Sequence, residues 1–266
     1  MSAAVPTAPV TIQTQRPGVP FARLVKVELR KMFNTRSGFW LVASSLIISI
    51  IAAICVIAFV PDQDLTYGIF GAAFGTPLAI FLPIIAALAV TAEWSQRSGL
   101  VTFSLAPHRG AVIGAKAVAS IIVAVVAIVF AMIVGALGNV VGAALNGIDP
   151  VWDMEALDIV YLFIGNIFGL MIGFMFGVLL RNSAAAVVAY LVYSFVLPAI
   201  FQLLAALQEW FNDLQPWVDF GDAQTPLFGG GSLSGEEWAQ LGTSSLIWFW
   251  IPLAFGVWSV LRAEVK

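Results

Sequence analysis

Long apolar stretches separated by short polar segments are the main feature of this sequence. Six of the stretches are long enough to cross a membrane, because a helix needs about 20 mostly apolar residues to span about 30 Å of hydrocarbon. They lie at residues 38–60, within 65–92, within 117–148, and at 159–180, 183–207 and 238–261. The pattern therefore predicts an all-α membrane protein with six transmembrane helices.

The polar segments between these stretches differ in charge. All 12 Lys and Arg residues lie before the first predicted span, between the second and third, between the fourth and fifth, or after the sixth. The other segments contain no basic residue and carry most of the 15 acidic residues. Because basic segments stay on the cytoplasmic side of a membrane, we expect both termini to be cytoplasmic. A different number of spans would not give this separation.

The composition agrees with a membrane protein. Hydrophobic residues make up 61% of the chain and charged residues only 10%, whereas a soluble domain is about half apolar and about a quarter charged. An excess of this size requires lipid as a solvent. No acidic or basic residue lies deep in a predicted span, which disfavours an ion-coupled carrier and an intramembrane hydrolase.

Motifs for catalysis or for a bound cofactor are missing from the sequence. The single Cys55 cannot form an internal disulfide, and the single His108 excludes a site with several histidines within one chain. The chain has no Gly-x-x-x-x-Gly-Lys-Ser/Thr loop, so it cannot cradle ATP in that way. We therefore expect a protein that is not an enzyme, holds no cofactor or metal of its own, and binds no nucleic acid.

The first 36 residues form two segments of different character. Residues 1–20 are rich in Pro, Thr, Ala and Gln and contain no apolar run, which predicts a flexible cytoplasmic tail. Residues 21–36 have an apolar face at helical spacing and an opposite basic face. The basic positions are Arg23, Lys26, Arg30 and Lys31. We expect an amphipathic helix on the anionic headgroup layer of the bilayer, although a basic flank that only sets the topology would explain the charge equally well.

Residues 91–116 form the longest predicted cytoplasmic insertion between two spans. They combine several charged side chains with Trp94 and Phe103. One interpretation is a short helix parallel to the membrane that docks into a groove of a partner. The other is an ordinary loop whose basic residues set the topology.

A strip of glycines marks the fourth predicted span. Gly165, Gly169, Gly173 and Gly177 recur at intervals of four and share one helical face, where another backbone can approach closely. The strip predicts helix packing, within the chain or with another chain. Asn166 beside it is a candidate for a hydrogen bond between helices or for a substrate contact.

The segment 208–242 is too long for a plain connection between two spans. It carries several aromatic residues among acidic ones, which predicts partly helical segments in the outer membrane interface. An aromatic belt without a functional role is the alternative. Ser234 and Glu237 have the spacing of a capping box at the start of the sixth span.

Two segments of the sequence are similar to those of a known family. Residues 28–37, ELRKMFNTRS, precede the first span, and residues 93–99, EWSQRSG, follow the second, with PHRG at 107–110 and then Lys116. The order of these segments resembles that of the type-2 ABC transporter permeases, the membrane subunits of bacterial ABC exporters. The resemblance extends over residues 21–266.

This resemblance implies a six-span permease domain at residues 37–266, with a cytoplasmic coupling segment at 91–110 that docks on an ATPase. The coupling residues that it implies are Glu93, Trp94, Arg97, Gly99 and Phe103. It also implies a second permease, as a homodimer or a heterodimer, and separate ATPase subunits that hold ATP and Mg²⁺. The expected location is the bacterial plasma membrane.

The expected function is therefore that of an exporter subunit. The apolar walls favour a hydrophobic or amphipathic cargo, such as a drug, a lipid or a peptide. A non-transporting membrane scaffold or regulator fits the glycine strip and the basic segments equally well. An ion-coupled secondary carrier is disfavoured by the lack of ionisable groups in the spans.

Overall fold

The computed structural model describes residues 19–34, 36–95 and 108–262. Five helical segments in this part are long and apolar enough to cross a membrane. They are α3 (Tyr67–Ser95), α5 (Arg109–Asn146), α6 (Ala156–Leu180), and the segments Ser183–Leu207 and Gly235–Arg262. Each of the last two contains a π-helical turn between two α-helices, α7 (Ser183–Leu191) with α8 (Leu197–Leu207) and α11 (Gly235–Ser245) with α12 (Ile251–Arg262). The prediction of an all-α membrane protein is confirmed.

The first predicted span corresponds to α2 (Arg36–Phe59). This helix has 24 residues and carries no charged residue after Arg36. The third predicted span corresponds to α5, which has 38 residues and begins eight positions before residue 117. At about 1.5 Å per residue, α5 is longer than the hydrocarbon core of a bilayer is thick, so it extends beyond the apolar layer.

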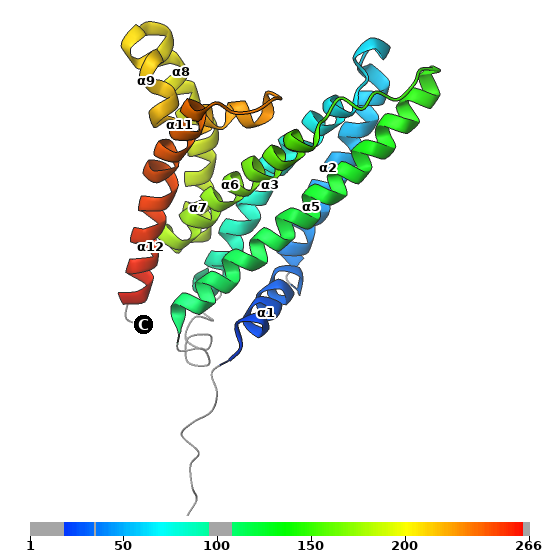
Figure 1. Cartoon of the computed structure of the whole chain (residues 1–266). Helices are drawn as coiled ribbons and strands as arrows, with labels where there is room; N and C mark the ends of the chain where they lie inside the picture. The colour runs from blue at the N-terminus through cyan, green and yellow to red at the C-terminus, as the bar shows by residue number, and fades with distance from the viewer. Residues whose placement is uncertain (1–18, 35, 96–107, 263–266) are drawn as a thin grey trace, which may run out of the picture.

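The helices form two arms that diverge toward one end of the molecule (Figure 1). In one arm, α3 packs along α6 and also contacts α2 and α5. Six residues of α3 in the main hydrophobic core recur every four positions, namely Phe70, Phe74, Leu78, Leu82, Ala86 and Val90. In the other arm, α8 and α11 contact α9 (Glu209–Val218). Contacts of α7 with α3 and of α12 with α6 join the two arms.

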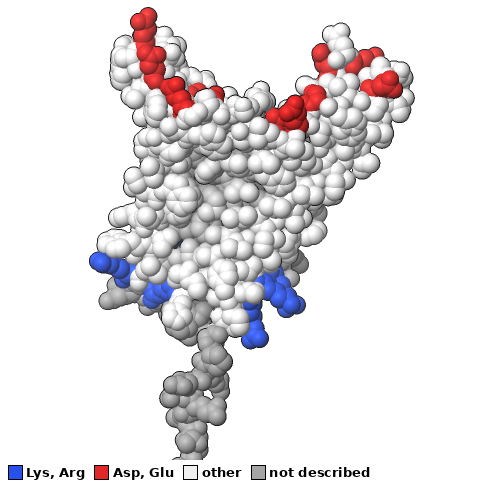
Figure 2. Space-filling model, viewed as in Figure 1, with Lys and Arg blue, Asp and Glu red and all other residues white. Residues whose placement is uncertain are grey.

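Charged side chains gather at opposite ends of this bundle (Figure 2). Lys and Arg lie at the end where α1 (Phe21–Asn34) and the C-terminal end of α12 are found, which we call the basic end. Asp and Glu lie at the tips of the two diverging arms, which we call the acidic end. The separation predicted from the loops is therefore present in the folded chain.

The segment 208–242 is helical over much of its length, as predicted. It contains α9, α10 (Phe220–Ala223), a 3-10 turn at Thr225–Phe228 and the first residues of α11. The predicted capping box is confirmed, because the Ser234 hydroxyl accepts from the Glu237 amide at 3.2 Å and the Glu237 carboxylate accepts from the Ser234 amide at 2.6 Å. The last span therefore begins at Gly235, three residues before the predicted position.

Candidate functional site

The helix α1 has the predicted amphipathic character but packs against the bundle as well. Arg23, Lys26 and Arg30 are exposed, whereas Leu24 and Leu29 are partly buried. The inner face of α1 contacts α5 and α2. Contact of this helix with lipid headgroups stays a prediction.

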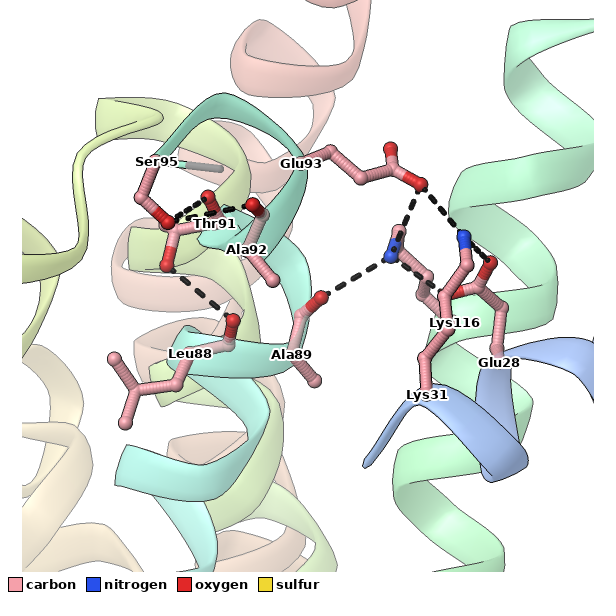
Figure 3. Close-up of polar contacts among 9 residues, drawn as sticks. All are labelled: Glu28, Lys31, Leu88, Ala89, Thr91, Ala92, Glu93, Ser95 and Lys116. Carbon is pink, nitrogen blue, oxygen red and sulfur yellow. Dashed lines mark hydrogen bonds and ion pairs between the residues drawn. The ribbon is translucent and has the colours of Figure 1, made fainter. Parts of the chain in front are cut away.

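Two lysines and two glutamates from three helices meet at the basic end (Figure 3). Lys116 Nζ of α5 lies 2.6 Å from Glu28 Oε2 of α1 and 3.5 Å from Glu93 Oε1 of α3. Lys31 Nζ of α1 lies 2.7 Å from Glu28 Oε1 and 3.1 Å from Glu93 Oε1. Lys116 also donates a hydrogen bond to the carbonyl oxygen of Ala89 at 3.1 Å. These four charged residues, which we call the charge network, join α1, α3 and α5.

Three members of the charge network are buried. Glu93 and Lys116 are each 3% exposed and Glu28 is 6% exposed. Removing an ion from water costs several kcal/mol, and an oppositely charged partner offsets that cost. The network contains two positive and two negative charges, so its charges balance. Glu93 Oε2 nevertheless has no hydrogen-bond partner among the residues that the structure describes.

Lys31 is the member of the network closest to solvent, with a side chain that is 42% exposed. Burial lowers the pKa of Lys31, but hydrogen bonds and the negative charges of Glu28 and Glu93 raise it more. The pKa of Lys31 therefore lies above its ordinary value, and the side chain is positively charged at neutral pH.

The charge network lies at the two helix ends that flank residues 96–107. Of the predicted coupling segment 91–110, Thr91–Ser95 belong to α3 and the last two residues belong to α5. Glu93 is thus buried among lysines rather than displayed on the surface, and Trp94 packs against the main hydrophobic core. Arg97, Gly99 and Phe103 lie outside the described residues.

Sequence reasoning missed the role of Glu28. The sequence does indicate that Glu28 is unusual. Residues 24, 25, 28, 29 and 32 share one helical face, and Glu28 is the acidic residue in the middle of that otherwise apolar face. An acidic residue at such a position needs a buried partner. The partner Lys116 is 88 positions away in the chain, so no local pattern identifies it.

Other polar contacts connect helices near the basic end. The hydroxyls of Thr91 in α3 and Ser183 in α7 are 2.8 Å apart. Arg109 of α5 donates to the carbonyl of Val260 in α12 at 3.1 Å, and Arg181 after α6 donates to the hydroxyl of Ser259 in α12 at 2.8 Å. These three contacts, which we call the basic-end contacts, hold the two arms together at this end.

A cavity of about 800 Å³ lies between the arms on the side of the acidic end. Its walls come from α3, α6, the segment Ser183–Leu207 and the outer segment around α10. Five glycines of α3 and α6 line these walls, and a Cβ atom on two of them, Gly75 and Gly169, would meet no atom within 4 Å. A volume of this size falls within the range of about 300–1,000 Å³ that is typical of small-molecule sites.

The four glycines of the predicted strip have three different environments. A Cβ atom on Gly173 would overlap the carbonyl oxygen of Pro83, and one on Gly177 would lie 2.9 Å from the carbonyl oxygen of Ala87. A Cβ on Gly165 would overlap the ring of Phe228. A Cβ on Gly169 would meet no atom within 4 Å, since this position faces the cavity. The packing partner of Gly173 and Gly177 is therefore α3 of the same chain, whereas Gly165 and Gly169 have other surroundings.

No protein-family model matches this chain, and no curated protein matches it.

A proline inside α3 creates a further contact between helices. Pro83 has no amide proton, so the carbonyl of Ala79 four residues earlier lacks its usual partner in the helix. The hydroxyl of Tyr190 in α7 donates to this carbonyl at 2.6 Å. The bond satisfies a polar group at membrane depth, where an unpaired carbonyl is costly, and it joins α3 to α7 beside the cavity.

The candidate site therefore has two parts at opposite ends of the bundle. The two arms are held together at the basic end and separated by a cavity toward the acidic end. Among the described residues, no group of three or more His, Cys, Asp or Glu side chains could hold a metal ion. The arrangement provides a cavity at one end and a buried electrostatic connection between helices at the other.

Proposed function

We propose that this chain is the membrane-spanning permease subunit of an ATP-driven ABC exporter in a bacterial plasma membrane. A second permease, identical or different, would complete the pathway, and separate ATPase subunits holding ATP and Mg²⁺ would supply the energy. The cargo would be hydrophobic or amphipathic. The observation that carries the proposal is the charge network of Glu28, Lys31, Glu93 and Lys116.

The charge network suits a subunit that receives a force at its basic end. A partner that pushed on residues 96–107 would act on the ends of α3 and α5 together, because these helices flank that segment. Lys116 and Glu93 join those two helices to each other, and Glu28 joins them to α1. Displacement of the coupling segment would thus move three helices at once. The basic residues around it support a cytoplasmic position for this end.

The cavity supports the same proposal from the opposite end. The acidic segments around it lack basic residues, which favours an external position. In an exporter that alternates between two access states, a cavity of this kind corresponds to the outward-facing state. Closure of the arms around it, and opening of the basic-end contacts, would then give the inward-facing state.

The proposal is tested by isolating the tagged chain in mild detergent from its native membrane and identifying the proteins that accompany it. We expect an ATPase at a fixed stoichiometry. Arg97→Ala, in the coupling segment, should weaken or abolish its recovery, and Glu93→Ala should do the same by disrupting the charge network. Glu209→Ala, an exposed change at the acidic end, is the matched control and should retain the ATPase.

Reconstitution provides the functional measurement. Vesicles containing the chain and its ATPase should move a hydrophobic or amphipathic solute only when ATP is present. Recovery of the chain without an ATPase under several gentle conditions would contradict the proposal and favour a scaffold. Transport that continues without ATP but stops when an ion gradient collapses would favour a secondary carrier.

A further inference from the structure

We propose that the cavity toward the acidic end is a binding site for a drug-sized amphipathic organic cation. The site is formed by this chain alone, and its chemistry selects positive charge. The inference rests on the proposed function only in identifying the bound cation as the cargo of the exporter.

Three carboxylates line the cavity, from Asp153, Asp158 and Asp219. Each accepts a hydrogen bond from a backbone amide, donated by Gly68 at 2.6 Å, by Glu155 at 2.8 Å and by Gly221 at 2.9 Å, respectively. Asp219 also accepts from the Asp222 amide at 3.3 Å and from the Gln215 side chain at 3.2 Å.

None of these three carboxylates forms an ion pair within the described part of the chain. The four ion pairs found there belong to the charge network at the basic end. The Lys and Arg side chains visible in Figure 2 lie at that end as well. The three carboxylates therefore border the cavity without an ion-pair partner in the described structure, and Asp219, which is buried, lies where low-dielectric walls strengthen its field.

The side chain of Asn166 supports the site independently of the carboxylates, because it carries a buried hydrogen-bond acceptor without a partner in the described structure. Asn166 of α6 is 5% exposed and lines the cavity. Its side-chain nitrogen donates to the carbonyl oxygen of Leu162 at 2.9 Å, which fixes the orientation of the amide, because only the NH₂ group can donate to a carbonyl. Its oxygen Oδ1 has no hydrogen-bond partner among the described residues. A buried acceptor of this kind is costly unless it is satisfied. This oxygen is covered by neighbouring atoms in this structure, so a cation or an N–H group of a ligand would satisfy it after a small shift of the side chains around it.

Aromatic side chains add to the same preference. Tyr190, Tyr193, Phe195 and Phe228 line the cavity, and the face of an aromatic ring attracts a cation that lies within about 6 Å of its centre. The hydroxyl oxygen of Tyr193 is buried and also lacks a partner in the described structure. Carboxylates, an amide oxygen and aromatic faces all attract positive charge, while the glycine-lined walls leave room for an apolar body.

Two ions of nearly equal size and opposite charge test the inference. Radiolabelled tetraphenylphosphonium and radiolabelled tetraphenylborate are dialysed to equilibrium, in separate experiments, against the purified full chain in non-ionic detergent. We expect saturable binding of the cation and no saturable binding of the anion. The variant with both Asp153→Asn and Asp158→Asn should bind the cation at least about tenfold more weakly, which corresponds to about 1.4 kcal/mol.

The asparagine side chains of this variant keep an oxygen that accepts the amide hydrogen bonds, so the change removes charge rather than the local backbone contacts. Asp213→Asn is the matched control, because Asp213 is an exposed acidic residue of α9 that does not line the cavity. It should leave the affinity unchanged within about twofold. Equal binding of both ions, no saturable binding of the cation, or equal effects of the two sets of Asp→Asn changes would overturn the inference.

The proposed function and this inference can fail separately. The Asp153→Asn and Asp158→Asn variant should retain the co-purifying ATPase, because both residues lie at the end opposite the charge network. Charge-selective binding without any associated ATPase would support the site and contradict the exporter. An associated ATPase without charge-selective binding would support the exporter and refute the cationic cargo.

Discussion

Substitution of Lys116 by methionine tests whether the charge network holds the basic end together. Methionine preserves much of the length and volume of lysine but removes its charge. In the variant, Glu28 and Glu93 would share a single positive partner, Lys31, which is itself partly exposed. Two buried carboxylates would then be compensated by one cation, and the carbonyl of Ala89 would lose the hydrogen bond from Lys116.

The expected cost follows from the burial of the network. Removal of one partner from a buried ion pair destabilises a protein by about 3–5 kcal/mol, because the remaining charge is left uncompensated. The Lys116–Glu28 pair meets this condition, since both side chains are buried and the atoms are 2.6 Å apart. For a chain of this size, about 1 kcal/mol corresponds to about 2–4 °C in Tm. Lys116→Met should therefore lower Tm by about 6–20 °C.

Intrinsic tryptophan fluorescence during heating is the suitable assay, because the chain has nine Trp residues. A thiol-reactive dye is unsuitable, since Cys55 is exposed in the folded chain. Lys26→Met, on the exposed face of α1, is the matched control and should change the free energy of unfolding by less than about 0.5 kcal/mol. A second change, Glu93→Gln, should recover part of the loss by removing the unpaired charge. Equal shifts for Lys116→Met and Lys26→Met would refute the reasoning.

Three further predictions concern the walls of the cavity and the helix contacts beside it. Gly173→Ala should destabilise the chain by about 1–3 kcal/mol through overpacking against the backbone of α3, whereas Gly169→Ala should raise the Tm by up to the equivalent of about 1 kcal/mol, since alanine is the better helix former. Tyr190→Phe should cost about 1–3 kcal/mol, measured as a fall in Tm, because the carbonyl of Ala79 loses its donor; no change would show that another donor replaces it. Gly169→Cys in a Cys55→Ser background should react with a membrane-impermeant maleimide that is added outside intact cells. A cysteine at position 169 that fails to react would contradict the predicted external position of the acidic end.

The spans were predictable because each depends on local composition. An apolar run of about 20 residues identifies a helix without any knowledge of its neighbours, and the segment Ser183–Leu207 has the predicted boundaries. The start of α5 was not predictable in this way. Lys116 marks the end of an apolar run in the sequence, yet the helix continues past it to Arg109 because Glu28 and Glu93 neutralise the lysine inside the fold.

The cavity could not be predicted from the sequence either, because it depends on residues that are distant from one another along the chain. Spacing alone gave the four glycines of α6 one common role, but their environments depend on what lies opposite each of them. Gly173 faces the backbone of Pro83, whereas Gly169 faces open space. The sequence makes Asn166 a candidate for either helix packing or substrate contact, and its two polar side-chain atoms have different hydrogen-bonding environments. The nitrogen bonds within α6, and the oxygen is left without a partner in the described structure.

The polar contacts at the basic end differ in strength, and this difference predicts which helices move. Of the three basic-end contacts, the bond between Thr91 and Ser183 is neutral and worth about 0.5–1.5 kcal/mol, whereas the two bonds donated by Arg109 and Arg181 are worth about 1.5–3 kcal/mol each. Together they are worth about 3.5–7.5 kcal/mol. Reversal of a two-state population from 1:99 to 99:1 needs about 5.5 kcal/mol. A differential affinity of about 5.5 kcal/mol is comparable with the sum of the three contacts, so a partner that binds one state more tightly by this amount is able to open them.

The charge network is harder to break, because each buried partner that is removed costs about 3–5 kcal/mol. We therefore expect α1, α3 and α5 to move as one unit and α12 to move relative to them. Spin labels at exposed positions on α1 and α5 should keep their separation when ATP is added to the complete transporter, whereas labels on α5 and α12 should change theirs. A change of the α1–α5 distance with a constant α5–α12 distance would mean that the network, and not the basic-end contacts, is the part that opens.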